Sequence, residues 1–168
     1  MKQLEALKIE LARLCPELEL REKEPMSRHT SFHIGGPAAL MALPKSESQV
    51  EVAVRTAYEM EVIPFFMGNG SNLLVPDEGV DRFLIKSVPG LDWCRSEGET
   101  LLAGAGITLA RLAVFARDAG LTGLEFAHGI PGSLGGAVTM NAGAYGGEMA
   151  QVVRSVDCLT RSGERETV

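Results

Sequence analysis

Clustered glycine is the feature that most restricts how this chain can fold. Sixteen of the 19 glycines lie between Gly68 and Gly147, in short groups and without a three-residue period. This distribution excludes collagen and low-complexity linkers. Because glycine loses more backbone entropy on folding than any other residue, the groups indicate main chain that is held in particular conformations.

The overall composition predicts a folded, water-soluble protein. The chain has 168 residues, of which 45% are apolar and 23% are charged, so it can bury a sizeable core. Its formal net charge of -6 disfavours sequence-independent attraction to nucleic acid or to an anionic membrane. An anionic ligand would therefore need local hydrogen-bond donors.

The cysteines and the first residues indicate a cytoplasmic protein. Cys15, Cys94 and Cys158 are far apart and form no C-x-x-C pair, so neither a disulfide framework nor a thiolate metal site is predicted. Charges occur throughout the first twenty residues, unlike in a secretory signal or a membrane span.

Helices and strands alternate in the first half of the chain. An apolar stripe from Leu4 to Leu14 predicts an amphipathic helix that Pro16 closes, and the polar segment 21–38 is expected to be extended. The pattern then predicts a strand at 38–43, a helix at 47–61 capped by Ser46, a buried strand at 62–67 and another strand at 83–86. The order strand, helix, strand predicts a right-handed crossover unit.

A second unit is expected to begin after a boundary at 87–90. Residues 100–103 predict a strand, and Thr108 is the expected cap of a helix that runs to Gly120. A final strand at 155–161 leads into a turn at 162–163. Because the partner strand has barely begun at the last residue and leaves an exposed edge, we expect the sequence to be cut short.

The first candidate binding segment, Gly68 to Leu74 (GNGSNLL), directly follows the predicted buried strand. Glycines at alternating positions allow positive φ and let successive N–H groups point into one concavity that binds anions. Ser71 and Asn72 add side-chain donors. A tight turn between two strands is the alternative interpretation; the added Ser-Asn-Leu-Leu favours ligand binding.

The second candidate segment runs from Gly129 to Val138 (GIPGSLGGAV) and continues from Asn141 to Gly147 (NAGAYGG). Pro131 suits the first turn of a helix, and the glycines would let that helix N-terminus approach a phosphate or a flat ring closely. Close packing of a helix on a sheet, followed by a loop, is the alternative interpretation.

Other nucleotide and catalytic motifs do not occur. Neither segment matches the P-loop or the Rossmann pattern, and there is no G-x-S-x-G. His29 and His33 are four residues apart but lie in a predicted extended segment, so a metal site is not predicted. His128 precedes the second segment, where it would either contact a ligand or serve as an ordinary surface histidine.

Three segments in a fixed order, HTSFHIGGPA, GNGSNLLV and GLEFAHGIPGSLGGAVTMNAGAYGGEM, resemble the UDP-N-acetylenolpyruvoylglucosamine reductase family. The similarity covers about residues 28–149, and IPGSLGGAV resembles the second type of this enzyme. The resemblance implies an α+β, two-lobed FAD-binding fold of the vanillyl-alcohol-oxidase (PCMH) type, truncated before the domain that binds the UDP-sugar. The implied organisation is an N-terminal helix and linker at 1–27, a first FAD-binding lobe at 28–87 and an incomplete second lobe at 88–168.

The resemblance also implies an NADPH-dependent flavin oxidoreductase of peptidoglycan synthesis. It would hold FAD non-covalently, use NADPH as co-substrate and act on a UDP-sugar, with no nucleic-acid or membrane partner. The implied contacts to FAD are Gly68, Asn69, Gly70, Ser71, Asn72 and Leu73 in the first segment, and Ile130, Pro131, Gly132, Ser133, Gly135, Gly136, Ala137, Val138, Asn141, Ala142 and Gly143 in the second. The catalytic arginine, serine and glutamate of the family have no counterpart in this chain, so no catalytic residue and no metal ligand is assigned.

Two other hypotheses remain open from the sequence. One is an oxidase or dehydrogenase of the same superfamily, with FAD attached covalently to His128 or His29. The other is a non-catalytic module that binds a nucleotide without NADPH-dependent turnover.

Overall fold

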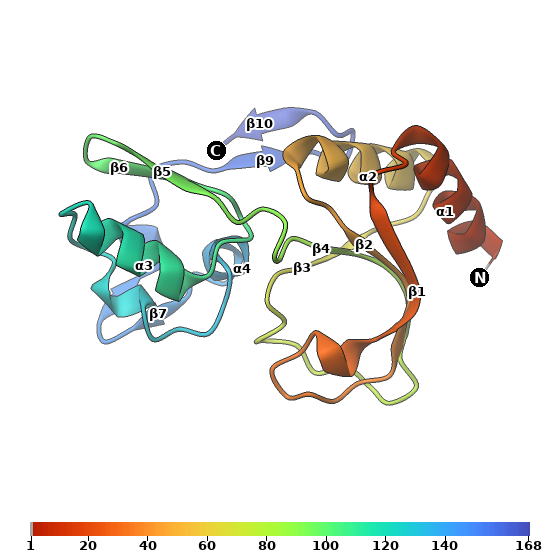
Figure 1. The fold of residues 1–168 in the computed structure, drawn as a ribbon, viewed down its shortest axis with the longest axis horizontal. Coiled ribbons are helices and arrows are strands. Elements are labelled where there is room, and N and C mark those ends of the chain that lie inside the picture. Colours follow the sequence, from red (N-terminus) through yellow and green to blue (C-terminus); the bar gives the residue numbers. More distant parts are fainter. Residues whose placement is uncertain (1) are drawn as a thin grey trace.

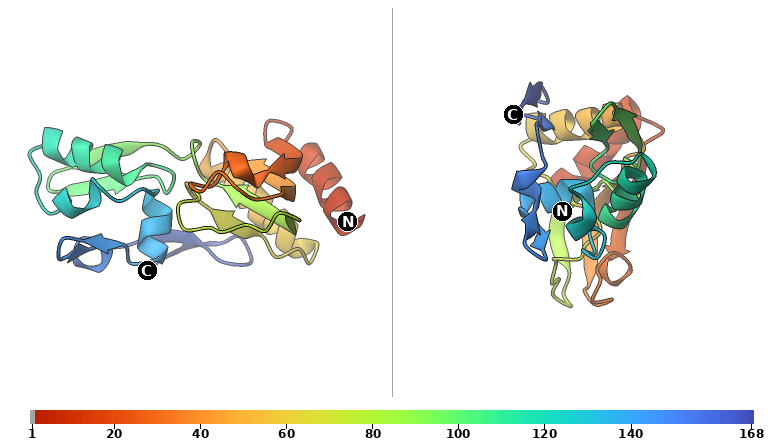
Figure 2. Two further views of the ribbon diagram at one scale, coloured as in Figure 1. Left: turned by 90° about the horizontal axis from the view of Figure 1, so that it is seen from below. Right: turned by 90° about the vertical axis from the view of Figure 1, so that its left-hand side faces the viewer.

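The computed structural model describes residues 2–168, and its elements form two groups that lie side by side along the long axis (Figures 1 and 2). The helices are α1 (Lys2–Leu14), α2 (Glu47–Glu59), α3 (Leu109–Asp118) and α4 (Leu134–Thr139), with short 3-10 turns η1 (Met26–Arg28), η2 (Glu125–Ala127) and η3 (Met149–Gln151). The strands are β1 (Glu19–Pro25), β2 (Pro37–Leu43), β3 (Phe65–Met67), β4 (Val80–Lys86), β5 (Cys94–Glu97), β6 (Thr100–Ala103), β7 (Gly143–Ala144), β8 (Gly147–Glu148), β9 (Asp157–Leu159) and β10 (Arg165–Thr167).

The first group is built on a four-stranded sheet with the order β1-β2-β4-β3. β1 pairs antiparallel with β2, whereas β2 and β3 both pair parallel with β4. The predicted strands at 38–43 and 83–86 and the helix between 47 and 61 are confirmed, and the Ser46 side chain accepts a hydrogen bond from the Gln49 N–H as predicted. The strand expected at 62–67 is confined to residues 65–67, and Phe66 within it is exposed.

β1 was not predicted as a strand, because its residues are mostly charged. It is an edge strand that pairs only with β2, and charged side chains are common on such edges, where they discourage further pairing. The hydrophobic alternation used to recognise strands therefore does not occur in it.

Alternating side chains of β2 and β4 face opposite sides of the sheet. Leu40, Phe83 and Ile85 pack with α1 and α2 in the larger core cluster. Met41, Leu84 and Met67 of β3 face the other side, where Met26 and Val75 cover them. This second side is covered by loops rather than by helices, and the first glycine segment lies among these loops.

The second group has its own smaller core around Leu109, Phe126, Ala127 and Met149. The β5–β6 hairpin precedes α3, whose predicted cap is confirmed, since the Thr108 side chain accepts from the Arg111 N–H. The expectation for Pro131 was wrong. α4 begins at Leu134 with Ser133 at its N-cap, so Pro131 lies before the helix.

The last hairpin, β9–β10, returns to the first group (Figure 1). Leu159 packs against the larger core, and Arg165 forms ion pairs with Glu47 and Glu51 of α2 at 3.2 and 2.5 Å. The second strand of this hairpin, which had seemed barely begun, is thus paired with β9 and held against α2. No described helix is both long enough and apolar enough to cross a membrane.

Candidate functional site

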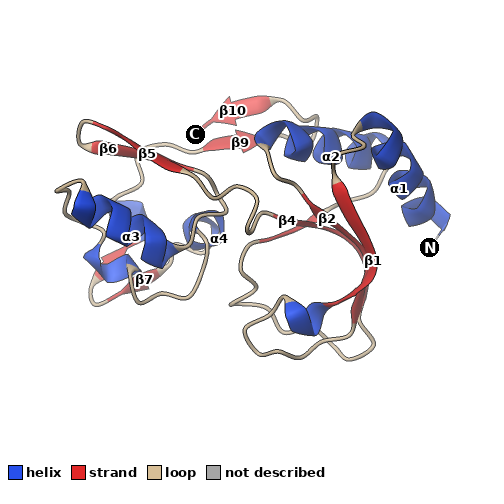
Figure 3. Ribbon diagram, in the orientation of Figure 1, coloured by secondary structure: helices blue, strands red, loops and turns tan. Residues whose placement is uncertain are grey.

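The two glycine segments meet at the junction between the two groups of elements. A β-carbon placed on Gly68 would lie 1.9 Å from the Ser133 Oγ, and one placed on Gly132 would lie 3.5 Å from the Ser71 Oγ. The main chain of the first segment therefore contacts the residues that precede α4. Most of both segments is loop (Figure 3).

The turn at Gly70 is fixed by the loop that precedes β2. Gly70 has φ +69°, and a β-carbon there would lie 1.9 Å from the His29 carbonyl oxygen. The Ser31 N–H donates to the Gly70 carbonyl at 3.2 Å. Only glycine combines this φ with so close an approach of another chain segment, so the packing requires glycine at position 70.

The second segment is tied to the turn that follows β6. The N–H of Leu109 donates to the Gly132 carbonyl, that of Leu134 to the Ile107 carbonyl and that of Gly135 to the Ala105 carbonyl, at 2.8–3.0 Å. These bonds set the direction from which α4 begins. The Gly104-Ala105-Gly106 turn thus also helps to position the second segment, because the Ala105 carbonyl accepts from the Gly135 N–H.

Several main-chain donors at this junction have no protein acceptor. Within the described part of the chain, no main-chain hydrogen bond uses the N–H groups of residues 69–72, Gly132, Ser133 or Gly136. Amides at a glycine turn and at a helix start bind anions when they converge. The junction therefore offers donors to an anionic group without requiring a lysine.

The Ser133 hydroxyl gives independent support for a ligand. Its residue is 2% exposed, and its Oγ has no hydrogen-bond partner among residues 2–168. A buried hydroxyl without a partner costs about 1–3 kcal/mol. A phosphate oxygen between the two segments would provide the missing acceptor, so the residues present fit a diphosphate.

The remaining predicted contacts fall into three groups. Leu73 packs in the smaller cluster beneath the sheet, and Ile130, Val138 and Ala142 pack around the core of the second group, so their side chains also have structural roles. Asn72 and Pro131 are exposed. The third group lies in or near α4: Gly135, Gly136 and Ala137 are within the helix, and Gly143 is in β7.

Asn141 ends α4. It has φ +44°, its N–H donates to the Val138 carbonyl, and the following N–H of Ala142 donates to the Ala137 carbonyl, which is the Schellman pattern. The Asn141 Oδ1 also accepts from the Ala150 N–H at 2.8 Å. The asparagine therefore shapes the loop that follows α4.

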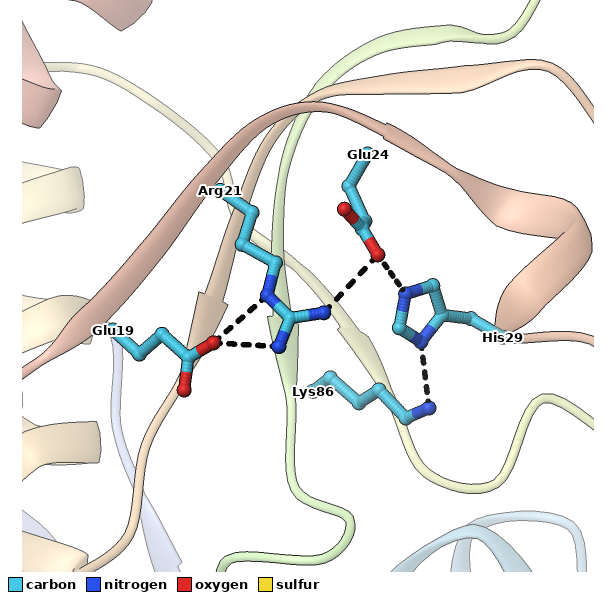
Figure 4. A network of polar contacts seen from close by, with 5 residues as sticks. All are labelled: Glu19, Arg21, Glu24, His29 and Lys86. Atoms are coloured by element: carbon cyan, nitrogen blue, oxygen red, sulfur yellow. Dashed lines mark hydrogen bonds and ion pairs between the residues drawn. The ribbon is translucent and has the colours of Figure 1, made fainter.

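A polar network lies beside the first segment (Figure 4). Glu24 accepts from His29 Nε2 at 2.8 Å and from Arg21 at 3.1 Å, and Arg21 also binds Glu19. The His29 Nδ1 lies 2.9 Å from the Lys86 Nζ. Burial opposes ionisation of Glu24, but hydrogen bonds from His29 and Arg21 outweigh it and lower the pKa of this carboxyl below its usual value. Burial, and then the charge of Arg21, lower the pKa of Lys86.

This network is not predictable from local sequence patterns, because His29 and Lys86 are 57 residues apart. In the described residues, no group of three or more His, Cys, Asp or Glu side chains could hold a metal ion. His33 and Asn69 line one cavity of about 280 Å³, and His128 is exposed.

The fold and the paired glycine segments define a class of dinucleotide-binding, two-lobed α+β proteins. A family model described as "FAD binding domain" matches residues 38–168, and the chain belongs to this family. The structure also resembles 4-ethylphenol oxidase from Gulosibacter chungangensis, with TM-score 0.76 and 16% identity over 99% of this chain and 35% of that one. The predicted fold of the vanillyl-alcohol-oxidase (PCMH) type is thereby confirmed.

The particular relatives agree with the family resemblance found in the sequence. UDP-N-acetylenolpyruvoylglucosamine reductase of Alkaliphilus oremlandii is 44% identical over 164 residues, which are 98% of this chain and 54% of the relative. The structure of UDP-N-acetylenolpyruvylglucosamine reductase from Thermus caldophilus has TM-score 0.71 and 32% identity, over 90% of this chain and 52% of that one. The chain spans about half the length of the curated relatives it matches.

Proposed function

We propose that this chain binds FAD non-covalently at the junction of its two glycine segments. The observation that carries the proposal is the contact of Gly68 with Ser133, which brings the unpaired amides of both segments together around a buried hydroxyl that has no partner. The diphosphate would accept hydrogen bonds from the N–H groups of 69–72, Gly132, Ser133 and Gly136. Residues 130–143 would flank the flavin ring.

We further infer that the chain is the FAD-binding portion of an NADPH-dependent reductase that converts UDP-N-acetylglucosamine enolpyruvate to UDP-N-acetylmuramate. The names of its relatives support this inference. Bound FAD would supply hydride transfer between NADPH and the enolpyruvyl group, while this chain binds and orients it. The reaction belongs to cytoplasmic peptidoglycan synthesis. We propose 28–87 and 88–168 as the two lobes that bind FAD, preceded by the helix and linker at 1–27.

FAD binding by the purified wild-type chain and by its Ser133→Ala variant tests this proposal. The wild type should quench the fluorescence of added FAD and become yellow. Removing the hydroxyl should weaken FAD binding by about tenfold, because one hydrogen bond to a charged oxygen is lost. The same substitution should leave the free energy of unfolding without ligand unchanged or slightly higher, since it removes an unpartnered buried group.

Ser155→Ala is the matched control, because Ser155 is exposed, and it should bind FAD like the wild type. A wild-type chain that neither quenches nor retains flavin would refute the binding proposal. Acid denaturation should release all of the flavin. Flavin that stays on the polypeptide would instead support a covalently flavinylated oxidase, although both ring nitrogens of His29 already have partners.

A further inference from the structure

A cavity of about 280 Å³ lies beside the first glycine segment. It is lined by Asn69, by Arg28, His29, Thr30, Ser31 and His33 of the preceding loop, and by Lys86. Lys86 ends β4 and pairs in register with Met67, the last residue of β3, so its main chain is next to the start of the glycine segment. The first glycine segment therefore contributes Asn69 to the wall of this cavity, one residue after Gly68, which contacts Ser133.

The cations of this cavity have no carboxylate partners. In the described part of the chain, no ion pair involves Lys86 or Arg28, although ion pairs are frequent elsewhere in the first group. Among the described residues, the Lys86 ammonium forms a single hydrogen bond, to His29. An ammonium group that is partly removed from water without a counter-charge is unfavourable, so this cavity is suited to an anion.

Glu24 and His29 hold the ammonium in place. A carboxylate can only accept, so the Nε2 of His29 carries the proton that is shared with Glu24, and Nδ1 remains the acceptor for Lys86. Glu24 is 7% exposed and is bound by Arg21 as well. The chain Glu24–His29–Lys86 (Figure 4) therefore fixes the position of Nζ, and Lys86 is one of the residues that line the cavity.

We propose that Lys86 and Arg28 form a cationic subsite beside Asn69 that takes one phosphate of the FAD diphosphate, with His29 and Glu24 as positioning residues for the lysine. This inference rests on the proposed function and adds side-chain charge to a site that otherwise consists of main-chain amides. Thr30 and Ser31 of the same cavity provide hydroxyl groups next to the phosphate.

The test compares FAD, riboflavin and inorganic pyrophosphate as ligands of the chain and of its Lys86→Gln variant. Riboflavin contains the ring system but no phosphate. Lys86→Gln should weaken FAD binding by about tenfold or more, because a charge-assisted hydrogen bond to the diphosphate is lost. It should leave riboflavin binding unchanged, and pyrophosphate should compete with FAD less well than in the wild type.

Two variants separate charge from structure. Lys86→Arg keeps the charge and should retain FAD affinity within about threefold, although its fork geometry differs. Lys45→Gln removes an exposed cation that lines only the neighbouring cavity of about 240 Å³ and should change nothing. Thermal unfolding without ligand should show Lys86→Gln to be no less stable than the wild type. Should that variant fail to fold, the exposed Arg28→Gln provides the same comparison.

The outcomes are distinguishable. A wild-type chain that binds no FAD refutes the proposed function, and calorimetry with pyrophosphate alone still tests the subsite: pyrophosphate binding that is lost in Lys86→Gln supports it, and binding that is unaltered overturns it. If the wild type binds FAD and both Lys86→Gln and Arg28→Gln bind it equally well, the subsite is overturned. Equal losses for FAD and riboflavin would likewise overturn it, because the effect would then not concern phosphate.

Discussion

Glu24 is the residue on which the polar network beside the first segment depends. Among the described residues it is the only charged residue that is buried, and it is bound by both Arg21 and His29. Because its pKa is lowered on folding, the folded protein holds its proton less tightly than the unfolded chain does. The stabilisation from this carboxylate is therefore fully present above the ordinary pKa of 4.5 and is lost as the pH falls through the lower folded value.

Glu24→Gln tests this at the level of the residue. At neutral pH the variant should unfold about 1–2 kcal/mol more easily, since charge-assisted hydrogen bonds become neutral ones. The difference from the wild type should shrink as the pH is lowered below 4.5. Denaturant titrations at several pH values measure it, with the exposed Glu17→Gln as control. A difference that is constant across acidic pH would show that the charge of Glu24 does not stabilise the fold.

The main-chain donors of the first glycine segment could be predicted from the sequence, but the charged network of Glu24, His29 and Lys86 could not. The spacing of Gly68, Gly70 and Ser71 directly indicates amides that are free to bind an anion, and the structure places Gly68 against Ser133 and Ser71 beside Gly132. Nothing in the local sequence links Glu24, His29 and Lys86, since the antiparallel pairing of β1 with β2 and the parallel pairing of β2 with β4 bring them together. Such contacts depend on the register of a sheet that local patterns do not specify.

At the level of the element, the end of α4 depends on one asparagine. Asn141→Ala should lower the free energy of unfolding by about 1–2 kcal/mol, because alanine is disfavoured at positive φ and the bond to Ala150 is lost. Asn141→Gly restores the backbone freedom but not the side-chain bond, so it should cost less, about 1 kcal/mol or below. Chemical denaturation of both variants provides the comparison. Equal losses would show that backbone strain at this position is small.

Helices were predicted better than strands for a physical reason. The apolar stripe of α1 and the caps Ser46 and Thr108 are local signals, and each was confirmed. β1 and β5 consist mainly of polar residues on sheets that are exposed on one side or at an edge, so neither shows a hydrophobic alternation. Helix α4 was expected near Pro131 but begins at Leu134, because the bonds of Leu134 and Gly135 to the turn after β6 determine its start.

At the level of the whole molecule, the contact of Gly68 with Ser133 joins the two groups of elements. Gly68→Ala would place a methyl group 1.9 Å from the Ser133 Oγ and 3.1 Å from its Cβ. Since Ser133 is buried, the segments must move apart, and we expect a loss of about 1–3 kcal/mol in unfolding free energy together with weaker FAD binding. Thermal unfolding and flavin titration measure these effects.

The control and the rescue variant make this prediction specific. Gly129→Ala meets no heavy atom within 4 Å and should stay within about 0.5 kcal/mol of the wild type. The double variant Gly68→Ala/Ser133→Ala removes the clashing hydroxyl and should recover part of the loss, which a double-mutant cycle quantifies. Additive effects of the two substitutions would mean that Gly68 and Ser133 do not touch in solution.

The return of the β9–β10 hairpin to α2 also affects how the molecule can move. The polypeptide passes between the two groups twice, once at 87–93 and once at 153–157. After the second crossing, Leu159 and Arg165 hold the hairpin against the first group. Two crossings restrict the relative motion of the two groups mainly to rotation about the line that joins the crossings. A single crossing would leave more directions of motion open. Gly68 itself lies next to Ser87, where the first crossing begins, so a bound dinucleotide would sit at the part of the junction that such a rotation displaces least.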